Sequence, residues 1–269
     1  MPRNEIEIFP DLHFGIVHDY DEKPNNIFFP LHNHDDIYEI VLLLNGDCEF
    51  QVEGNNYKLY PHDIFFTRPF ELHHITHLSG KPYERIILYL KSEYFRQNNC
   101  AEFLDIFQNR ELGHGNLIIH DIAERFLIDC MKRILNYCNQ NAYNVANKIV
   151  YEFLYLINCC KNSTNHSYTN NKHVRDIIVY INDHLSENVT LDTLSENFFI
   201  TKHHMCKIFK SATGYTINQY INYKRILLVQ ELYKSGRSLI QASMDAGFNS
   251  YANFYKAYVK QTGKSPKNM

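Results

Sequence analysis

The chain has 269 residues, 45% of them hydrophobic and 21% charged, which suits two globular domains and excludes a disordered or fibrous protein. No apolar run approaches the ~18 residues that span a bilayer, and the first residues lack the layout of a secretory signal, so we expect a cytoplasmic protein without a membrane partner. The net charge of -3 is unevenly divided, because residues 1–171 hold 14 Lys and Arg against 23 Asp and Glu while residues 172–269 hold 13 against 7, which favours a polyanion partner for the C-terminal part alone.

Residues from about 27 to 90 have the pattern of short strands. In DCEFQVE the apolar residues Cys48, Phe50 and Val52 alternate with polar neighbours, which is the two-residue period of a half-buried strand. Turn signals at NGD and EGNN separate such segments. This region is therefore predicted to form a small antiparallel barrel or sandwich.

The pattern becomes helical beyond Leu117. Apolar residues recur four positions apart at Ile122, Phe126, Cys130 and Ile134, and a second helical run follows in VANKIVYEFLYLINCC. We expect these helices, within residues 113–160, either to cover the barrel or to pair two subunits. The Asn-, Ser- and Thr-rich residues 161–171 have almost nothing to bury and are predicted to be a linker.

The residues after this linker are predicted to be helical and to contain two copies of one unit of about fifty residues. FKSATGYT and YVKQTGKS match in character at a shift of 49 residues. In the first copy a short helix stops near Phe198 and a second begins after Thr201, with Thr190 and Thr201 as N-caps and Gly214 at the end of the second helix. Each copy is thus predicted to be a helix-turn-helix.

The second helix of the first copy has two distinct faces. Its packing stripe is Met205, Ile208, Phe209 and Ala212. The opposite face is compact, cationic and hydrogen-bonding, and consists of Lys202, His203, Cys206, Lys207 and Lys210. Such a face suits a helix that lies in a DNA major groove. An ordinary solvated helix is the alternative, but from Thr201 onward 11 basic residues stand against only Glu231 and Asp245, which favours the groove.

The second copy presents a less polar outward face after Ser250, which is a candidate N-cap. This face consists of Tyr251, Ala252, Tyr255 and Lys256. Ala252 suits contact with a thymine methyl group, and Lys256 suits a phosphate or a guanine. We therefore expect more backbone contact and less base recognition here than in the first copy.

At this point the sequence resembles the AraC/XylS family of bacterial transcription regulators over essentially its whole length. The resemblance is carried by IFKSATG, by Tyr220 and Arg225 of YINYKR, by the pair Gly247 and Phe248, and by TGKSP. It implies a DNA-binding domain over residues 172–269, in which a long helix at 217–234 joins the two units and sets their recognition helices in successive major grooves, about 34 Å apart. Two departures are Ser195 and Ser243, where the family usually has alanine, and the family's closing tyrosine and arginine are missing after SP.

The strand region, residues 1–112, resembles a cupin barrel. The first cupin motif is matched by His32, His34, Glu39 and Gly46, and the second by Asp63 and His73, although His62 replaces the usual glycine. In cupin enzymes the three histidines and the glutamate hold iron, manganese or zinc, and imidazole with carboxylate suits all three metals. In the regulators the same barrel more often holds a small organic effector.

The resemblance to the regulators favours a small-molecule effector, with a sugar as the candidate, and no metal or cofactor. The expected effector-binding residues are His32, His34, Tyr38, Glu39 and His73. Aromatic rings could stack on a sugar, among them Phe28, Tyr38, Phe50, Phe65 and Phe66. A metal site and a structurally satisfied histidine cluster stay open as alternatives.

The function implied is that of a sequence-specific regulator of transcription, an activator and not an enzyme. It would bind double-stranded DNA as a homodimer paired through residues 113–160, with RNA polymerase as a further candidate partner. The alternative is a metal-dependent cupin enzyme whose C-terminal part is an interaction module. That alternative leaves the basic residues after Thr201 without an explanation.

Overall fold

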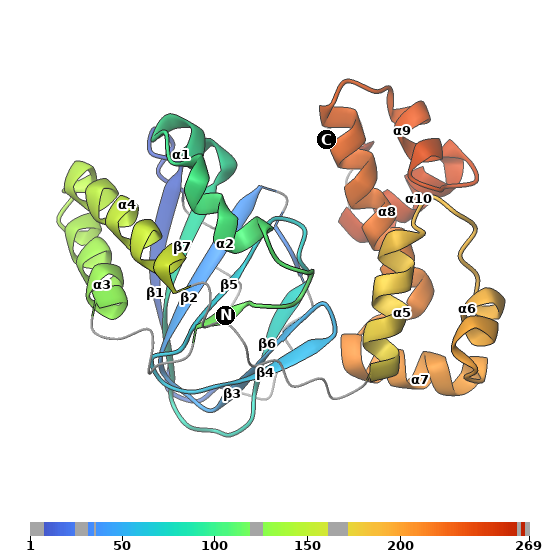
Figure 1. Cartoon of the computed structure of the whole chain (residues 1–269), viewed down its shortest axis with the longest axis horizontal. Coiled ribbons are helices and arrows are strands. Elements are labelled where there is room, and N and C mark those ends of the chain that lie inside the picture. Colours follow the sequence, from blue (N-terminus) through green and yellow to red (C-terminus); the bar gives the residue numbers. More distant parts are fainter. Residues whose placement is uncertain are drawn as a thin grey trace. The chain divides into compact units, whose positions relative to one another are not determined.

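Two antiparallel sheets form the N-terminal unit (Met1–Tyr168) of the computed structural model, which describes residues 8–24, 32–34, 36–118, 126–160, 172–262 and 265–266 (Figure 1). The five-stranded sheet has the order β1 (Phe14–Asp21), β7 (Tyr83–Lys91), β2 (Ile37–Asn45), β5 (Ile64–Thr67) and β8 (Leu117–Ile118). The three-stranded sheet has the order β4 (Asn55–Leu59), β3 (Cys48–Val52) and β6 (His73–His77). Predicted antiparallel strands are thereby confirmed.

The space between the two sheets is filled by a buried cluster that includes Val41, Phe50, Phe65 and Tyr89. The predicted alternation in β3 is confirmed, because Cys48, Phe50 and Val52 are all fully buried. β1, which lies outside the predicted strand region, pairs with β7 along its whole length, from Phe14 opposite Leu90 to Asp21 opposite Tyr83. It escaped prediction because an edge strand with one exposed half has a weak apolar alternation.

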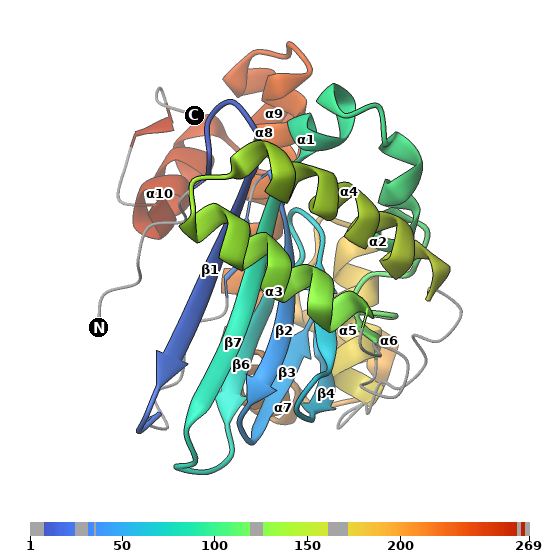
Figure 2. The same ribbon diagram turned by 90° about the vertical axis from the view of Figure 1, so that its left-hand side faces the viewer.

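The outer face of the five-stranded sheet is covered by α3 (Phe126–Asn139) and α4 (Tyr143–Cys159), as Figure 2 shows. α1 (Ser92–Gln97), the 3-10 turn at Ala101–Leu104 and α2 (Asp105–Gln108) complete this layer. Cys130 and Ile134 pack into it as predicted, but Phe126, the first described residue of α3, is 72% exposed. Ile122 and the predicted linker 161–171 lie outside the described residues.

His62, at the position where cupins usually have glycine, has a φ of 76° and is exposed. Its backbone conformation is the left-handed one, which costs an L-residue about 1–2 kcal/mol relative to glycine. We expect His62→Gly to stabilise the N-terminal unit by up to about 1 kcal/mol, because glycine's greater freedom in the unfolded chain offsets part of the gain. Urea denaturation of the whole chain measures this, and a lowered transition midpoint would contradict it.

The C-terminal unit (Thr169–Met269) is all-helical. Its helices are α5 (Lys172–Asp183), α6 (Leu191–Phe198), α7 (Lys202–Thr213), α8 (Ile217–Lys234), α9 (Leu239–Asp245) and α10 (Tyr251–Thr262). The two predicted helix-turn-helix units are α6–α7 and α9–α10, joined by α8. Among the residues that the structure describes, none of these helices has the length and apolarity that crossing a bilayer requires.

Capping side chains set the helix boundaries of both units as predicted. Thr190 accepts a hydrogen bond from the backbone of Thr193, Thr201 from that of His204, and Ser250 from that of Asn253. Gly214 ends α7 in the left-handed conformation, with a φ of 75°. These local contacts fix where each helix begins, and therefore which side chains share its outward face.

The two serines that replace the usual alanines are both accommodated. Ser195 donates its hydroxyl to the carbonyl of Ile200 at 2.7 Å, and Ser243, which is fully buried, donates to that of Ile240 at 2.8 Å. A buried hydroxyl with an acceptor costs little. This departure from the family pattern therefore leaves the helix-turn-helix geometry intact.

Candidate functional site

Four side chains converge in the N-terminal unit: His32 and His34 from the segment before β2, Glu39 and His73. β2 supplies Glu39 and β6 begins with His73. The backbones of His32 and His73 exchange two hydrogen bonds of 3.1 and 2.9 Å, which place the two residues side by side. Pairing of segments distant in the sequence therefore assembles this group, which we call the histidine cluster.

The cluster is centred on the carboxylate of Glu39. Its Oε2 atom lies 3.0 Å from His34 Nε2 and 2.9 Å from His73 Nε2. The His32 ring lies 4.4 Å from that of His73, centroid to centroid. Glu39 and His73 are buried, whereas His32 and His34 are partly exposed, so one side of the cluster is accessible to a ligand.

Hydrogen bonds determine the charge state of the buried pair. Burial alone would raise the pKa of Glu39, but hydrogen bonds from His34 and His73 hold this pKa well below its usual range. Burial alone would lower the pKa of His73, but its hydrogen bond to Glu39 raises it. His73 Nδ1 donates to the carbonyl of Glu71 at 2.8 Å, so Nε2 is the atom turned toward Glu39. Both shifts favour a protonated imidazole on His73 beside an ionised carboxylate on Glu39.

The donor set also fits a divalent metal ion. One ligand atom from each of the four residues lies within 4.8 Å of the others, and three imidazoles with one carboxylate suit iron, manganese or zinc. The contact between His73 Nδ1 and a backbone carbonyl is of the kind that orients metal-binding histidines. The cluster could thus hold a metal or bind hydroxyl groups, since its atoms include both donors and acceptors.

Tyr38, a predicted effector-binding residue, does not join the cluster. Successive side chains of a strand point to opposite faces, so Tyr38 lies on the other side of β2 from Glu39. Its ring packs 5.1 Å from that of Phe95 and 4.9 Å from that of Phe107. The other aromatic residues predicted to stack on a sugar are divided between two places. Phe66 faces the helical layer, and Phe28 lies outside the described residues. Phe50, whose ring lies 6.1 Å from that of His73, belongs to the core between the sheets, as does Phe65.

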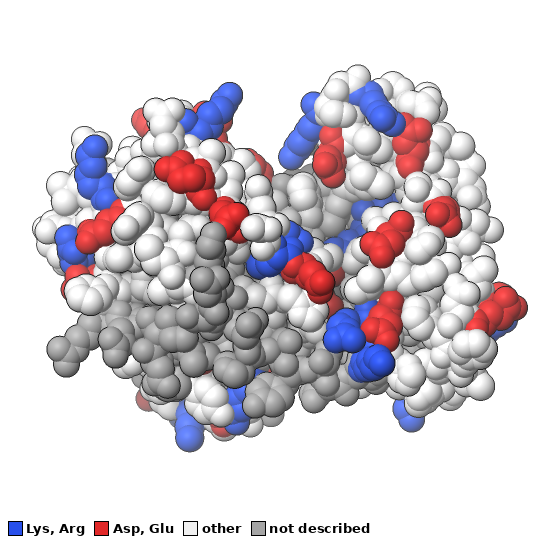
Figure 3. Space-filling model, viewed as in Figure 1, with Lys and Arg blue, Asp and Glu red and all other residues white. Residues whose placement is uncertain are grey.

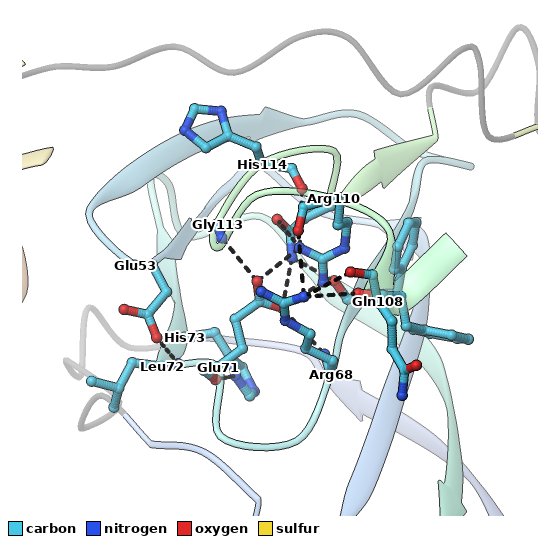
Figure 4. Close-up of polar contacts among 12 residues, drawn as sticks. Glu53, Arg68, Glu71, Leu72, His73, Gln108, Arg110, Gly113 and His114 are labelled. Carbon is cyan, nitrogen blue, oxygen red and sulfur yellow. Dashed lines mark hydrogen bonds and ion pairs between the residues drawn. The ribbon is translucent and has the colours of Figure 1, made fainter. Parts of the chain in front are cut away.

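A buried ion pair next to the cluster was not predicted. Glu71, fully buried, binds Arg110 through both carboxylate oxygens, and its backbone carbonyl holds His73 (Figure 4). The two residues are 39 positions apart, so no local pattern in the sequence reveals the pair.

The outward face of α7 is arranged as predicted. Met205 and Phe209 are fully buried, while the side chains of Lys202, His203, Lys207 and Lys210 are exposed and Cys206 is partly exposed. Lys202 forms an ion pair with Asp192 of α6, so its ammonium group is partly neutralised. The structure therefore places the other four predicted residues together on one polar, outward face of α7. Lys202, at the start of the helix, is held by its ion pair with Asp192.

On α10, Ala252, Tyr255 and Lys256 are exposed, whereas Tyr251 packs partly against the core of this unit. A hollow of about 400 Å³ opens beside Lys256 and is lined also by Arg225, Lys260, Asn222, Asn249 and Asn253. Amide and cationic groups of this kind suit a phosphate oxygen. Lys260 and the asparagines were not predicted, because the hollow forms only where α8, α10 and the turn before α10 meet.

Basic and acidic side chains are interspersed on the face drawn in Figure 3. Among the described residues drawn there, lysine and arginine side chains of the C-terminal unit alternate with carboxylates and form no continuous basic stripe. On this face, therefore, the basic excess of the C-terminal unit does not by itself mark a binding surface.

Two family models match the chain, one for each unit. The model of AraC-like ligand-binding domains matches residues 13–111, and the model of helix-turn-helix domains matches residues 194–269. The chain is 23% identical to the HTH-type transcriptional activator RhaS of Escherichia fergusonii over 246 residues, which cover 90% of this chain and 87% of RhaS. It is 26% identical to the regulatory protein SoxS of Escherichia coli over 98 residues, 36% of this chain and 92% of SoxS. A crystal structure of ToxT from Vibrio cholerae is similar with a TM-score of 0.42 and 14% identity, over 95% of this chain and 96% of ToxT.

Proposed function

This chain belongs to the AraC family of DNA-binding transcriptional regulators controlled by a ligand, and on that premise we propose which residues recognise DNA and the effector. The observation that carries the proposal is the pairing of a ligand-binding domain with two helix-turn-helix units whose outward faces are polar. We infer further that the protein activates transcription, as the name of RhaS says of that relative, and that it has no catalytic activity of its own.

In this proposal α7 recognises bases and α10 mainly contacts the DNA backbone. His203, Cys206, Lys207 and Lys210 would face base edges in the major groove, with Lys202 at the groove's rim. Tyr251, Ala252, Tyr255 and Lys256 would lie in the next major groove, and the hollow beside Lys256 would receive a phosphate. The outward face of α7 is rich in cationic and hydrogen-bonding side chains, whereas that of α10 is less polar. This difference supports the division of roles.

We expect Lys207→Ala to weaken specific DNA binding by ~1–3 kcal/mol, because a lysine that contacts a guanine loses both a hydrogen bond and a charge interaction. Titration of promoter fragments and of unrelated DNA at one salt concentration measures the change. Lys234→Ala, which removes an exposed lysine at the end of α8, is the matched control and should lower both affinities alike. Unchanged specific affinity in Lys207→Ala would remove Lys207 from the base-recognising set.

The effector is proposed to bind at the histidine cluster. His32, His34, Glu39 and His73 can donate to and accept from the hydroxyl groups of a sugar, which is the candidate class. A divalent metal is the second candidate, supported by the four converging ligand atoms. Tyr38 is left out because its side chain belongs to the helical layer.

We propose that two copies pair through α3 and α4. We also propose that the protein acts in the cytoplasm and contacts RNA polymerase on DNA. Tyr151 and Tyr155 of α4 are 41% and 58% exposed, which supports pairing through this face. We also propose the following division of the chain: an effector-binding barrel at 1–112, a helical pairing segment at 113–160, a linker at 161–171 and a DNA-binding domain at 172–269.

Two measurements on the whole chain test the proposal. Gel shifts on promoter fragments should show binding that weakens steeply with added salt, as release of counterions from DNA demands. A thermal-shift screen of sugars and of divalent metals should find a ligand that raises the melting temperature of wild-type protein but not of Glu39→Gln. Metal-dependent turnover of a small substrate without DNA binding would instead favour the cupin enzyme.

A further inference from the structure

Glu71 lies at the junction between the histidine cluster and a loop on the other side of it. The loop is residues 109–116, between α2 and β8, and we call it the 109–116 loop. Figure 4 shows the Glu71 carboxylate turned toward Arg110 and Gly113 of this loop, while His73 lies on the opposite side of the Glu71 backbone. One residue therefore contacts both the cluster and the loop.

The carboxylate of Glu71 holds the loop through several donors. Arg110 donates to both oxygens, at 2.7 and 2.6 Å, the amide of Gly113 donates at 2.9 Å, and Asn116 Nδ2 donates at 3.0 Å. Glu71 is fully buried and the side chain of Arg110 is 8% exposed. Because all these donors share one acceptor group, the loop depends on the position of Glu71.

The backbone of residues 71–73 is itself fixed at each position. The carbonyl of Glu71 accepts the Nδ1 proton of His73 at 2.8 Å, and Leu72 exchanges hydrogen bonds of 2.9 Å with Glu53. Because Nδ1 is bound to the Glu71 carbonyl, Nε2 of His73 faces Glu39. A change at the cluster therefore has a short hydrogen-bonded route to the loop.

The loop leads directly into the edge of the five-stranded sheet. Asn116 exchanges two hydrogen bonds with the backbone of Phe66, at 2.9 and 2.8 Å, and β8 then pairs with β5 at Leu117 and Ile118. Displacement of the loop would thus reach β8 and its pairing with β5.

We propose that Glu71 is a positioning residue of the effector site, which presents Nε2 of His73 to the ligand and links occupancy of the cluster to the order of the 109–116 loop. The inference rests on the proposed binding of an effector at this cluster. A ligand that takes Nε2 of His73 or the carboxylate of Glu39 moves the imidazole ring, and the ring moves the Glu71 carbonyl. Since a packed polar network of this kind rearranges as a unit, the loop responds with it.

Amide hydrogen exchange in the full chain tests the link without any ligand, because the Gly113 amide donates to Glu71 directly. His73→Leu removes both ring nitrogens, whereas His73→Asn keeps a donor near the position of Nδ1. His73→Leu loses the hydrogen bond to the Glu71 carbonyl, which frees Glu71 to move and weakens its contact with the Gly113 amide. We therefore expect exchange at Gly113 to become about tenfold faster, the effect of about one hydrogen bond, and to stay near the wild-type rate in His73→Asn. His77→Leu, a buried histidine of the same strand, is the control and should leave Gly113 unchanged relative to amides in β7.

Nitrogen chemical shifts of the His73 ring test the reverse direction and do not depend on His73→Leu folding. Arg110→Lys keeps the charge but loses the paired contact with Glu71, so we expect the Nδ1 signal of His73 to shift. Unaltered ring signals in Arg110→Lys, or equal Gly113 exchange in wild type and His73→Leu, would overturn the proposal. Neither experiment contains DNA, so failure of the gel shift would refute the proposed function and leave this link standing.

Discussion

Gly247→Ala should destabilise the C-terminal unit by about 3 kcal/mol or more and abolish specific DNA binding. Gly247 follows Ala246, the C-cap of α9, and has a φ of 92°, a conformation that costs an L-residue about 1–2 kcal/mol. A Cβ at this position would also overlap the carbonyl oxygen of Leu185 and lie 3.0 Å from Arg225 Nε. Overpacking against a main-chain atom adds about 1–3 kcal/mol, because no side-chain rotation relieves it.

Gly236→Ala separates these two costs. Gly236 has a φ of 97°, close to that of Gly247, but a Cβ there would meet nothing within 4 Å. We expect it to cost about 1 kcal/mol and to leave DNA binding intact. Amide exchange in α8 and α10 of the full chain measures both variants. Equal destabilisation by the two would show that backbone conformation alone, and not the contact with Leu185, makes Gly247 necessary.

The close approach at Gly247 matters because it ties the two helix-turn-helix units together. Arg225 of α8 donates to the carbonyls of Leu185 and Glu187, at 2.8 and 2.6 Å, and its guanidinium lies 6.0 Å from the ring of Phe248. The segment after α5, the long helix α8 and the turn of the second unit therefore meet at one point. Gly247, Phe248 and Arg225, which carry the family resemblance, thus fix the relative placement of α7 and α10, on which binding in two successive grooves depends.

Features set by short-range contacts were predictable from the sequence. The limits of α6 and α7 follow from Thr190 and Thr201, whose hydroxyls satisfy backbone groups three residues away. The outward face of α7 follows from helical spacing alone, since Met205 and Phe209 must be buried together. The residues of the candidate site on α7 are therefore predictable from the sequence, and their role on DNA stays a prediction.

Features set by contacts between distant segments were not predictable. Strand alternation separates Tyr38 from Glu39, but which of the two faces the helical layer depends on which face of the sheet the helices cover. β8 is only two residues long and is held by pairing with β5 and by Asn116. The same reason hides Glu71 and Arg110, since a buried ion pair depends on the burial of both partners and not on their spacing.

Arg110→Met should destabilise the N-terminal unit by about 3–5 kcal/mol at neutral pH, because it leaves the carboxylate of Glu71 buried without its counter-charge. The double variant Glu71→Met with Arg110→Met removes both charges and should recover much of this loss, since replacing a whole buried pair is far less costly than breaking it. Urea denaturation of the full chain measures both. A double variant as unstable as the single one would mean that the hydrogen bonds to Gly113 and Asn116, and not the charge pair, hold the loop.

The pH dependence of the same variant gives an independent check with a defined sign. Burial alone would raise the pKa of Glu71, but the charge and hydrogen bonds of Arg110 lower it to about 2. Because the carboxyl pKa is lower in the folded state than in the unfolded state, the wild-type pair adds roughly 3 kcal/mol to the free energy of unfolding above the unfolded pKa of 4.5. This contribution is lost as pH falls from 4.5 toward about 2. Arg110→Met lacks the charge that opposes burial, so its Glu71 has no such contribution to lose. The difference in stability between wild type and variant should therefore shrink between pH 4.5 and about 2, and a constant difference over that range would assign the effect of Arg110 to packing.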